Sequence, residues 1–317
     1  MKIICILLVI SSLAISQTLS SAKPTRVQHM IYDTRQKQIV LLSSASESGR
    51  EAVWNWNGKE WKLSSAPGPP AREASGAVYD TRRNRIVLFG GIGIKGEDDR
   101  LGDLWESNGS VWEQQATTSN ETRDHHFAAF DESRGRVVVY GGQPRDRSWL
   151  TDTFEWDGTN WTKLETPGPG GRVHFAMAYD SRRKRVLLFG GFDQNFKAHN
   201  DLWAWDGKSW QKLSESGPST RSHHAMAFDT ASNVLVLFGG ARAAKPTDAL
   251  DDTWLWDGQQ WKEIKTVGPP KRYLHLMAYD VARRKTVLYG GSSINGQVVT
   301  RYQDTWEWNG SRWQQIN

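Results

Sequence analysis

Cysteine is almost absent from this chain. Its 317 residues include one, Cys5, which lies in an apolar amino-terminal segment. If that segment is removed, the mature protein has no thiol, and therefore no disulfide, no cysteine nucleophile and no cysteine-ligated metal. The sequence also lacks a Gly-x-Ser-x-Gly elbow, a His-Glu-x-x-His pair and a phosphate loop. We therefore expect no catalytic residue, no metal ion and no cofactor.

The apolar segment at the amino terminus is shorter than a membrane-spanning helix. Residues 3–15 are uncharged and apolar. At about 1.5 Å per residue they are too short to cross a bilayer, but they suit the apolar region of a signal peptide. Small residues allow cleavage after residue 16 or after residue 22. We expect residues 1–22 to be a signal peptide and the mature protein to be secreted or periplasmic, without a transmembrane anchor. A retained amino-terminal anchor is the alternative.

One short stretch has the glycine spacing of a dinucleotide-binding loop. Gly91, Gly93 and Gly96 follow an apolar run, as such a loop requires. The residues after them show no helical periodicity, however, and include an Asn-Gly turn signal. The Gly-Gly pair also occurs five times, at steps of 51, 49, 49 and 51 residues, and one copy alone carries the further glycines. We conclude from this pattern that the chain binds no dinucleotide.

The glycine pairs instead mark a repeat. Aligned on them, the chain shows six units, and each unit begins with an apolar strand that ends in aspartate. These strands are expected at 27–33, 73–80, 124–131, 173–180, 222–229 and 273–280. A short polar turn follows, and then a continuous apolar run such as 234–238, which indicates a strand buried on both faces.

The second half of each unit is marked by tryptophan. Sixteen of the 17 tryptophans lie in the expected third and fourth strands, where they alternate with other residues at period two. Asn-Gly or Asp-Gly separates these two strands in every unit, which predicts type I′ hairpin turns. The turn glycines are Gly58, Gly109, Gly158, Gly207, Gly258 and Gly310.

Four antiparallel strands per unit, without a helix, predict one all-β domain. A single four-stranded sheet cannot bury both of its faces, but six sheets packed around an axis can. This arrangement is a six-bladed β-propeller, in which aromatic side chains fill the wedge between blades. We expect a single domain at 23–317, with blades at about 26–66, 70–118, 121–167, 170–216, 219–266 and 270–317.

Three motifs of the repeat resemble a known family. The Gly-Gly after the second strand, the Trp-x-Trp of the third and the Gly-x-x-Trp before the fourth resemble the kelch repeat, in the longer form of galactose-oxidase-like propellers. The resemblance covers about residues 26–317. It fails at Ser43 and Ser44, which replace the glycine pair, and at Ser107 and Phe154, which each replace a tryptophan. Blades 1 to 3 are therefore expected to be less regular.

The resemblance implies two chemistries, and one of them is excluded. Galactose-oxidase relatives hold copper with tyrosine and histidine, and one tyrosine is cross-linked to a cysteine. A mature chain without cysteine cannot form that cofactor. Exported sialic-acid mutarotases are another six-bladed class of kelch relatives. Such an enzyme needs a cationic cradle and a general acid–base, which arginine, histidine and a carboxylate can supply. An enzyme of this type acting on an acidic sugar is the alternative function.

The direction of the strands separates two faces of the propeller. We call face X the end at which each first strand begins. It carries the loops between second and third strands and the links between blades, whereas the opposite end, face Y, carries short turns. The loops on face X differ in every blade, and variable loops on a rigid scaffold are the usual site of function. Trp149, the one tryptophan outside the repeat pattern, lies in the face X loop of blade 3.

Repeated polar residues are also expected at face X. In one interpretation they form ion pairs within or between blades. In another they line the mouth of the central channel and hold an anionic small molecule, and a metal site is a third. The arginines are Arg72, Arg123, Arg172, Arg221 and Arg272; the histidines are His125, His126, His174, His223, His224 and His275; the aspartates are Asp103, Asp152, Asp201, Asp252 and Asp304.

Face Y is expected to be basic. Its turns at 80–85, 180–185 and 280–285 each carry several Arg or Lys residues, in a chain with a formal net charge of +5. Such a surface attracts phosphates or an acidic polymer. The same turn is neutral in blade 5, however, and no aromatic residues interleave with the basic ones. We therefore expect no nucleic-acid partner.

The leading hypothesis is an exported, non-catalytic, monomeric propeller that binds a protein or a glycan through face X. Large aromatic side chains commonly anchor such partners. The candidate ligand-binding residues are Trp149, Arg72, Arg123, Arg172, Arg221, Arg272, His126, His224 and His275.

Overall fold

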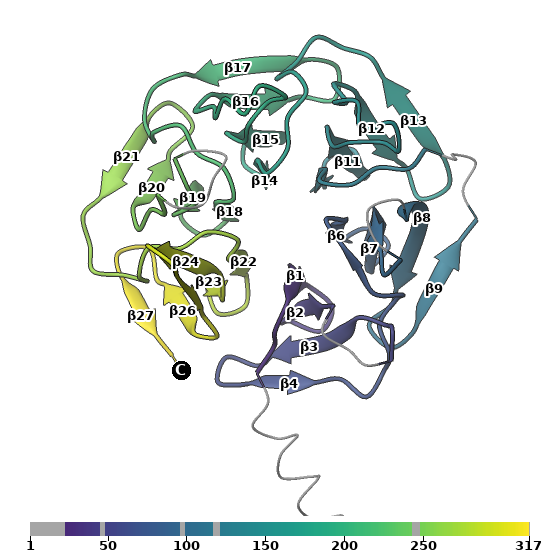
Figure 1. The fold of residues 1–317 in the computed structure, drawn as a ribbon, viewed down its shortest axis with the longest axis horizontal. Helices are drawn as coiled ribbons and strands as arrows, with labels where there is room; N and C mark the ends of the chain where they lie inside the picture. Colours follow the sequence, from purple (N-terminus) through teal and green to yellow (C-terminus); the bar gives the residue numbers. More distant parts are fainter. Residues whose placement is uncertain (1–22, 45–47, 96–98, 117–120, 243–247, 317) are drawn as a thin grey trace, which may run out of the picture.

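The computed structural model describes residues 23–44, 48–95, 99–116, 121–242 and 248–316. Within these ranges the regular elements are all β-strands, and no helix is long and apolar enough to cross a membrane. Figure 1 shows six sheets arranged in a ring, each running from an inner strand near the axis to an outer strand at the rim. The chain is an all-β, six-bladed β-propeller, as the sequence predicts. The expected signal peptide at 1–22 lies outside the described residues.

Each blade is antiparallel, with its four strands in chain order from the axis outwards. Blade 1 contains β1 (Val27–Asp33), β2 (Gln38–Ser43), β3 (Ala52–Trp56) and β4 (Trp61–Leu63). Blade 2 contains β6 (Gly76–Asp80), β7 (Arg85–Gly93), β8 (Arg100–Ser107) and β9 (Trp112–Gln115), with the short β5 (Arg72–Glu73) paired to the end of β7. Blade 3 contains β10 (Phe127–Asp131), β11 (Arg136–Tyr140), β12 (Thr153–Trp156) and β13 (Trp161–Leu164).

The remaining blades repeat this order. Blade 4 contains β14 (Ala176–Asp180), β15 (Arg185–Phe189), β16 (Leu202–Trp205) and β17 (Trp210–Ser214). Blade 5 contains β18 (Ala225–Asp229), β19 (Val234–Phe238), β20 (Thr253–Trp256) and β21 (Trp261–Ile264). Blade 6 contains β22 (Leu276–Asp280), β23 (Lys285–Tyr289), β26 (Thr305–Trp308) and β27 (Trp313–Gln315). The hairpin of β24 (Ser292–Asn295) and β25 (Val298–Arg301) extends its face X loop.

The core lies between neighbouring blades, where sheets pack face to face. In one cluster Leu187 and Phe189 of blade 4 pack against Leu235, Leu237 and Trp256 of blade 5. The second tryptophan of each Trp-x-Trp fills this wedge, and burial of such a large side chain contributes strongly to stability. These fully buried indoles belong to Trp56, Trp205, Trp256 and Trp308.

The inner strands of blades 2 to 6 begin three residues later than the sequence predicts. The residue two positions after each face X arginine has a φ of 52–56°, which breaks the strand. In blade 3 this residue is His125, and its N–H donates to the carbonyl of Ala74 in blade 2 at 2.8 Å. At the kink, the N–H of His125 therefore bonds to the neighbouring blade instead of to the next strand of its own blade. The kinked residues are Ala74, His125, His174, His223 and Leu274.

The three departures from the repeat pattern have unequal effects. A register shift interrupts the pairing of β1 with β2 in blade 1 and of β7 with β8 in blade 2. Blade 3, where Phe154 replaces a tryptophan, pairs without any shift, so the expected irregularity is wrong for this blade. Blade 4 keeps the pattern and nevertheless has a shift between β16 and β17. Side-chain identity at the third strand therefore does not control strand register.

The turns between third and fourth strands are not type I′, so that prediction is wrong. Each turn glycine has a φ of 90–102°, but the residue before it has no positive φ, whereas type I′ needs two. In blade 4 the N–H of Asp206 donates to the carbonyl of Ser209 at 3.4 Å. Gly207 and Lys208 are thus the central pair, and a positive φ at the first central residue fits type II′. The Asp206 carboxylate caps the turn by accepting the N–H groups of Lys208 and Ser209, both at 2.8 Å.

Packing of blade 6 against blade 1 closes the ring. Their inner strands β22 and β1 contact each other, and the two blades share one hydrophobic cluster. The indole of Trp61 donates to the hydroxyl of Thr305 at 3.1 Å, and the hydroxyl of Tyr289 donates to the carbonyl of Pro24 at 2.8 Å. Among the described residues, every sheet is built from strands of a single blade and none is exchanged between the termini.

Candidate functional site

The repeated arginines and aspartates of face X form one ion pair within each of blades 2 to 6. Both guanidinium NH groups reach the carboxylate in every pair, which is the two-point geometry that suits arginine. The shortest N–O distances are 2.6 Å for Arg72–Asp103, 3.1 Å for Arg123–Asp152, 2.7 Å for Arg172–Asp201, 2.7 Å for Arg221–Asp252 and 2.7 Å for Arg272–Asp304.

The same arginines also explain the glycine pairs. In blade 4, Nη1 of Arg172 donates to the carbonyl of Gly190 at 3.1 Å, so one guanidinium joins the starts of strands one and three to the end of strand two. The next blade fits against this corner, because the N–H of Gly191 donates to the carbonyl of Arg221 at 2.9 Å. A Cβ on Gly190 would lie 2.7 Å from that carbonyl oxygen. Only glycine leaves room for the neighbouring backbone.

Burial removes these arginines from contact with a ligand. The five residues are at most 2% exposed. Burial alone would raise the pKa of Asp252, but the hydrogen bonds and charge of Arg221 hold it below its ordinary value. The geometry therefore supports the structural interpretation of the ring, and leaves no exposed guanidinium there to form a cradle for an anionic sugar.

The histidines three residues after the face X arginines are also buried. His126, His224 and His275 are 1%, 4% and 3% exposed. The centroid of each imidazole lies 5.4–5.5 Å from that of a phenylalanine ring in the preceding blade, so the two rings are in van der Waals contact. Nε2 of His275 also lies 3.1 Å from the carbonyl oxygen of Phe238. Burial lowers the pKa of His275 to about 3 and those of His126 and His224 well below 6.5. These three candidates act as packing groups between blades.

Three other histidines reach face X at the axis, and we call His125, His174 and His223 the axial histidines. The rings of His174 and His223 stack with centroids 3.9 Å apart, and His125 meets His174 edge-on at 4.8 Å. Burial, and next the charge of neighbouring His223, lower the pKa of His174 well below 6.5. Burial, followed by the charge of His125, lowers that of His223 to about 4. The stack is therefore neutral at these two rings near neutral pH.

The axial histidines were not among the residues predicted to bind a ligand, although His125 and His223 directly precede the predicted His126 and His224. The strand kink turns the first histidine, with its positive φ, towards the axis and sends the second between the blades. Period-two alternation in the sequence already requires that neighbouring histidines point to opposite sides. The kink decides which of the two histidines is buried between blades. The local sequence does not predict the kink.

One axial histidine is held by a buried carboxylate. Nδ1 of His125 lies 2.6 Å from Oδ1 of Asp124. Asp124 is fully buried, and its second oxygen contacts the guanidinium of Arg100. The His125 side chain remains 30% exposed. A carboxylate that orients one imidazole nitrogen leaves the other free for acid–base work or for a ligand.

Face X also carries exposed apolar side chains. Phe196, in the loop between β15 and β16, is 70% exposed, and its ring stacks at 5.9 Å on Phe192. Phe192 in turn stacks at 5.3 Å on His174. Leu274, the kinked residue of blade 6, is 53% exposed. Further exposed apolar residues in the loops of this face are Ile94, Val298 and Val299.

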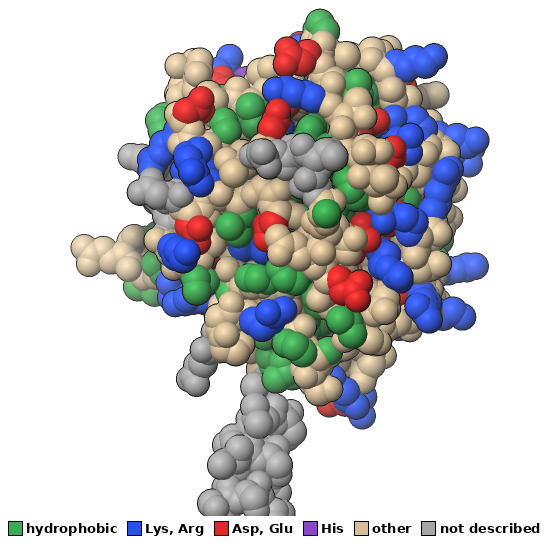
Figure 2. All heavy atoms as spheres, turned by 90° about the vertical axis from the view of Figure 1, so that its right-hand side faces the viewer, with side chains coloured by type: hydrophobic (Ala, Val, Ile, Leu, Met, Phe, Trp, Pro, Cys, Tyr) green, Lys and Arg blue, Asp and Glu red, His purple; other side chains and the backbone are tan. Residues whose placement is uncertain are grey.

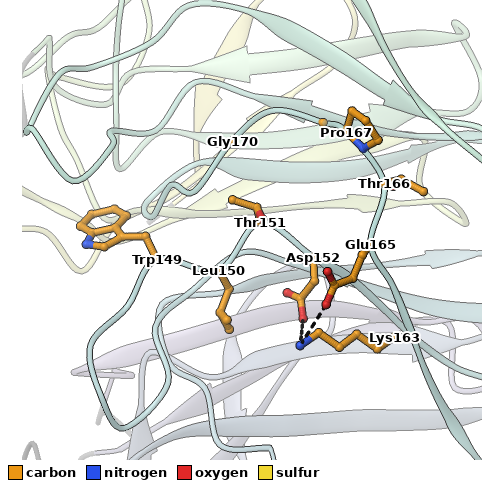
Figure 3. A pocket seen from close by; sticks show the side chains of 10 residues that line it. Trp149, Leu150, Thr151, Asp152, Lys163, Glu165, Thr166, Pro167 and Gly170 are labelled. Atoms are coloured by element: carbon orange, nitrogen blue, oxygen red, sulfur yellow. Dashed lines mark ion pairs between the residues drawn. The ribbon is translucent and has the colours of Figure 1, made fainter.

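Trp149 contacts the neighbouring blade and borders a pocket. Its ring lies 6.1 Å from that of Phe192 in blade 4. The pocket, of about 610 Å³, is lined by residues 149–152 of the face X loop, Lys163 of β13 and residues 165–168 and 170 of the link to blade 4. In Figure 3, Lys163 points towards Asp152 and Glu165, while the indole of Trp149 lies at the other end of the row. A ligand role for Trp149 stays a prediction.

Many basic residues of face Y are paired within the protein. Arg83 contacts Asp80 at 2.6 Å and Glu106 at 2.7 Å. Arg134, Arg183 and Arg283 pair in the same way with the aspartate three residues earlier. Seen from the side, Lys and Arg side chains gather along one edge of the ring (Figure 2). Within the described ranges, no group of three or more His, Asp or Glu side chains is placed to hold a metal ion.

Comparison with known proteins agrees with this architecture. Residues 150–317, just over half of the chain, match the model of the KLHDC2/KLHL20/DRC7 Kelch-repeats domain. The tRNA wybutosine-synthesizing protein 4 of Aspergillus fumigatus is 29% identical over 76 residues, which span 23% of this chain and 7% of that protein. The solved structure of YjhT aligns with a TM-score of 0.72 at 14% identity, over 93% of this chain and 98% of that one. The match and the fold confirm the resemblance to the kelch repeat.

Arg172→Ala should destabilise the protein by about 3–5 kcal/mol, because it leaves Asp201 buried without its cation. Arg182→Ala, at an exposed position on face Y, is the control and should change the free energy of unfolding by no more than about 0.5 kcal/mol. Urea denaturation of both variants measures the difference. Equal, small losses would mean that the arginine ring does not hold the blades together.

We expect the protein to lose stability as the pH falls from about 6.5 towards 4. Burial has lowered the pKa of several histidines, so in this range the unfolded chain binds more protons than the folded one. His224→Phe removes one such group, and Phe175 already occupies the equivalent position in blade 4. This variant should reduce the pH dependence of the free energy of unfolding by about 1 kcal/mol per pH unit near pH 5.5. An unchanged slope in urea denaturation across this range would contradict the assignment.

Proposed function

We propose that this chain, which belongs to the family of the KLHDC2/KLHL20/DRC7 Kelch-repeats domain, is an exported, non-catalytic protein whose partner docks on face X. The exposed apolar side chains of that face carry the proposal. Phe196 and Leu274, 70% and 53% exposed, stand on different blades, and Ile94, Val298 and Val299 extend the apolar surface to two more loops. Exposed apolar residues gathered on one face mark interaction sites.

The chemistry of this face favours a protein over a glycan. Aliphatic side chains such as Leu274 and Val298 offer a sugar neither a flat stacking surface nor hydrogen bonds. They do bury well against another protein, in which a few apolar and aromatic anchors supply most of the binding energy. A glycan is the other outcome of the experiment below.

Export and a monomeric state are further parts of the proposal. Export rests on the sequence alone: an apolar run at 3–15 with a signal-peptide pattern, and no cysteine after residue 22. The monomeric state is supported by a ring that one chain closes without a second copy.

Replacing Phe196 and Leu274 together by serine should weaken partner binding about tenfold or more while leaving the thermal stability nearly unchanged, because both side chains are exposed. The experiment immobilises the mature protein, captures partners from the native host's extracellular fraction, and measures the affinity of each purified partner. Val281→Ser is the matched control, since Val281 is 47% exposed in a face Y turn. A partner that binds the double variant as tightly as the wild type would exclude docking on this surface.

A second candidate, acid–base catalysis on an acidic sugar, is favoured by the contact between Asp124 and His125. A buried carboxylate that orients an exposed imidazole is the arrangement of a general acid–base. The arginine ring, however, is buried and cannot contribute the cationic cradle that the sequence suggested.

Exchange between the anomers of N-acetylneuraminic acid, followed by NMR, separates the two candidates. A non-catalytic protein leaves the exchange rate at its value in buffer. An enzyme that uses His125 would accelerate the exchange, and His125→Asn would remove about 10²–10⁴-fold of that acceleration. The second result would replace the binding proposal.

A further inference from the structure

Blade 3 lacks a hydrogen bond that four other blades share. In blades 2, 4, 5 and 6 the aspartate that opens the third strand accepts the indole N–H of the tryptophan two residues later. Blade 3 has Phe154 at that position, and a phenyl ring has no donor. Asp152 therefore lacks the neighbour that holds the equivalent carboxylates.

Blade 4 shows what that indole does. Trp203 donates to Asp201 at 2.7 Å, and Nζ of Lys212 lies over the indole, 5.2 Å from the ring centroid. The tryptophan thus separates the lysine from the aspartate. Lys163 occupies the same repeat position as Lys212, and in blade 3 its Nζ lies 3.5 Å from the carboxylate of Asp152 directly.

The ammonium of Lys163 is shared among carboxylates without a close contact to any of them. It lies 3.5 Å from Glu121 and 3.7 Å from Glu165, as well as 3.5 Å from Asp152. Charge-assisted N–H···O hydrogen bonds are shorter, about 2.7–2.9 Å. An oxygen beside such a pair can still accept from the ammonium and donate to a carboxylate, and so bridge them.

The charges of the pocket select the class of ligand. Two carboxylates, those of Asp152 and Glu165, and one cation, Lys163, line the pocket. The surplus of negative charge disfavours an anion, and Lys163 already stands where a cationic group would bind. A neutral hydroxyl group, which both donates and accepts, can bridge Lys163 and a carboxylate from the pocket side. Trp149 also lines the pocket, and its indole points away from Lys163 and Asp152 (Figure 3).

We propose that the pocket of blade 3 is a binding site for a neutral sugar. Its volume of about 610 Å³ lies within the ~300–1,000 Å³ typical of small-molecule sites. A sugar combines hydroxyl groups with an apolar C–H face, and so matches both the charged side chains and the tryptophan that line the pocket. This site lies beyond the docking surface proposed above and uses none of its residues.

Ligand-observed NMR with the mature protein tests the site. The probes are D-glucose, D-galactose, D-mannose and N-acetyl-D-glucosamine, with N-acetylneuraminic acid as the anionic comparison. We expect at least one neutral sugar to bind with a dissociation constant of about 10 mM or below, and at least tenfold more tightly than the anionic one. Lys163→Met should weaken that binding about tenfold or more, because it removes the shared donor.

Two further variants fix the location of the site. Lys212→Met makes the same change in blade 4, where the indole covers the aspartate, and should leave sugar binding unchanged. Phe154→Trp restores the repeat residue and its donor to Asp152, and should also weaken binding. If no neutral sugar binds, or if Lys163→Met and Lys212→Met bind equally well, the pocket holds only water and the proposal is wrong. Unchanged sugar binding in the Phe196 and Leu274 double variant separates this result from that of the docking surface.

Discussion

The structure depends on one arginine in each of blades 2 to 6. Its guanidinium joins the entry of the inner strand to the end of the second strand and to the aspartate that opens the third. Its backbone carbonyl in blades 3, 5 and 6 accepts an N–H from the glycine pair of the preceding blade. A buried cation must be paired and hydrogen-bonded, so its partners occur at fixed places in every repeat. Blade 1 lacks this arginine, and at its junction with blade 6 aromatic packing and the hydroxyl of Tyr289 take over.

The same corner decides which polar side chains face outwards at the axis. The residue two positions after the arginine takes a positive φ, and in blades 3, 5 and 6 its N–H donates to a carbonyl of the preceding blade. This local strain is offset by an inter-blade hydrogen bond. In three blades the strained residue is a histidine, and the result is the stack of His125, His174 and His223 beneath the apolar side chains of face X. The candidate site is therefore a by-product of how the blades are joined.

Departures from the repeat are where individual blades acquire properties of their own. Phe154 leaves strand pairing in blade 3 intact. It replaces, however, the indole that in blade 4 separates the lysine from the aspartate. The blade tolerates this change because its second tryptophan, Trp156, is still buried in the wedge between blades. Without that indole, Lys163 and Asp152 contact each other directly and line a pocket.

The sequence by itself determined the all-β class, the six blades, the order of strands and the residues of the ion-pair ring. All of these follow from local periodicity and from motifs repeated at constant spacing. It did not determine that the arginines are buried, that the turn glycines occupy the first central position, or that the first histidine of each adjacent pair stays partly exposed while the second is buried. Those outcomes depend on contacts between blades, through which residues about 50 positions apart fix each other's conformation. Only the tertiary structure shows that Lys163 contacts Asp152. The sequence shows that an indole is missing at residue 154, but the effect depends on which side chains lie next to that position in the fold.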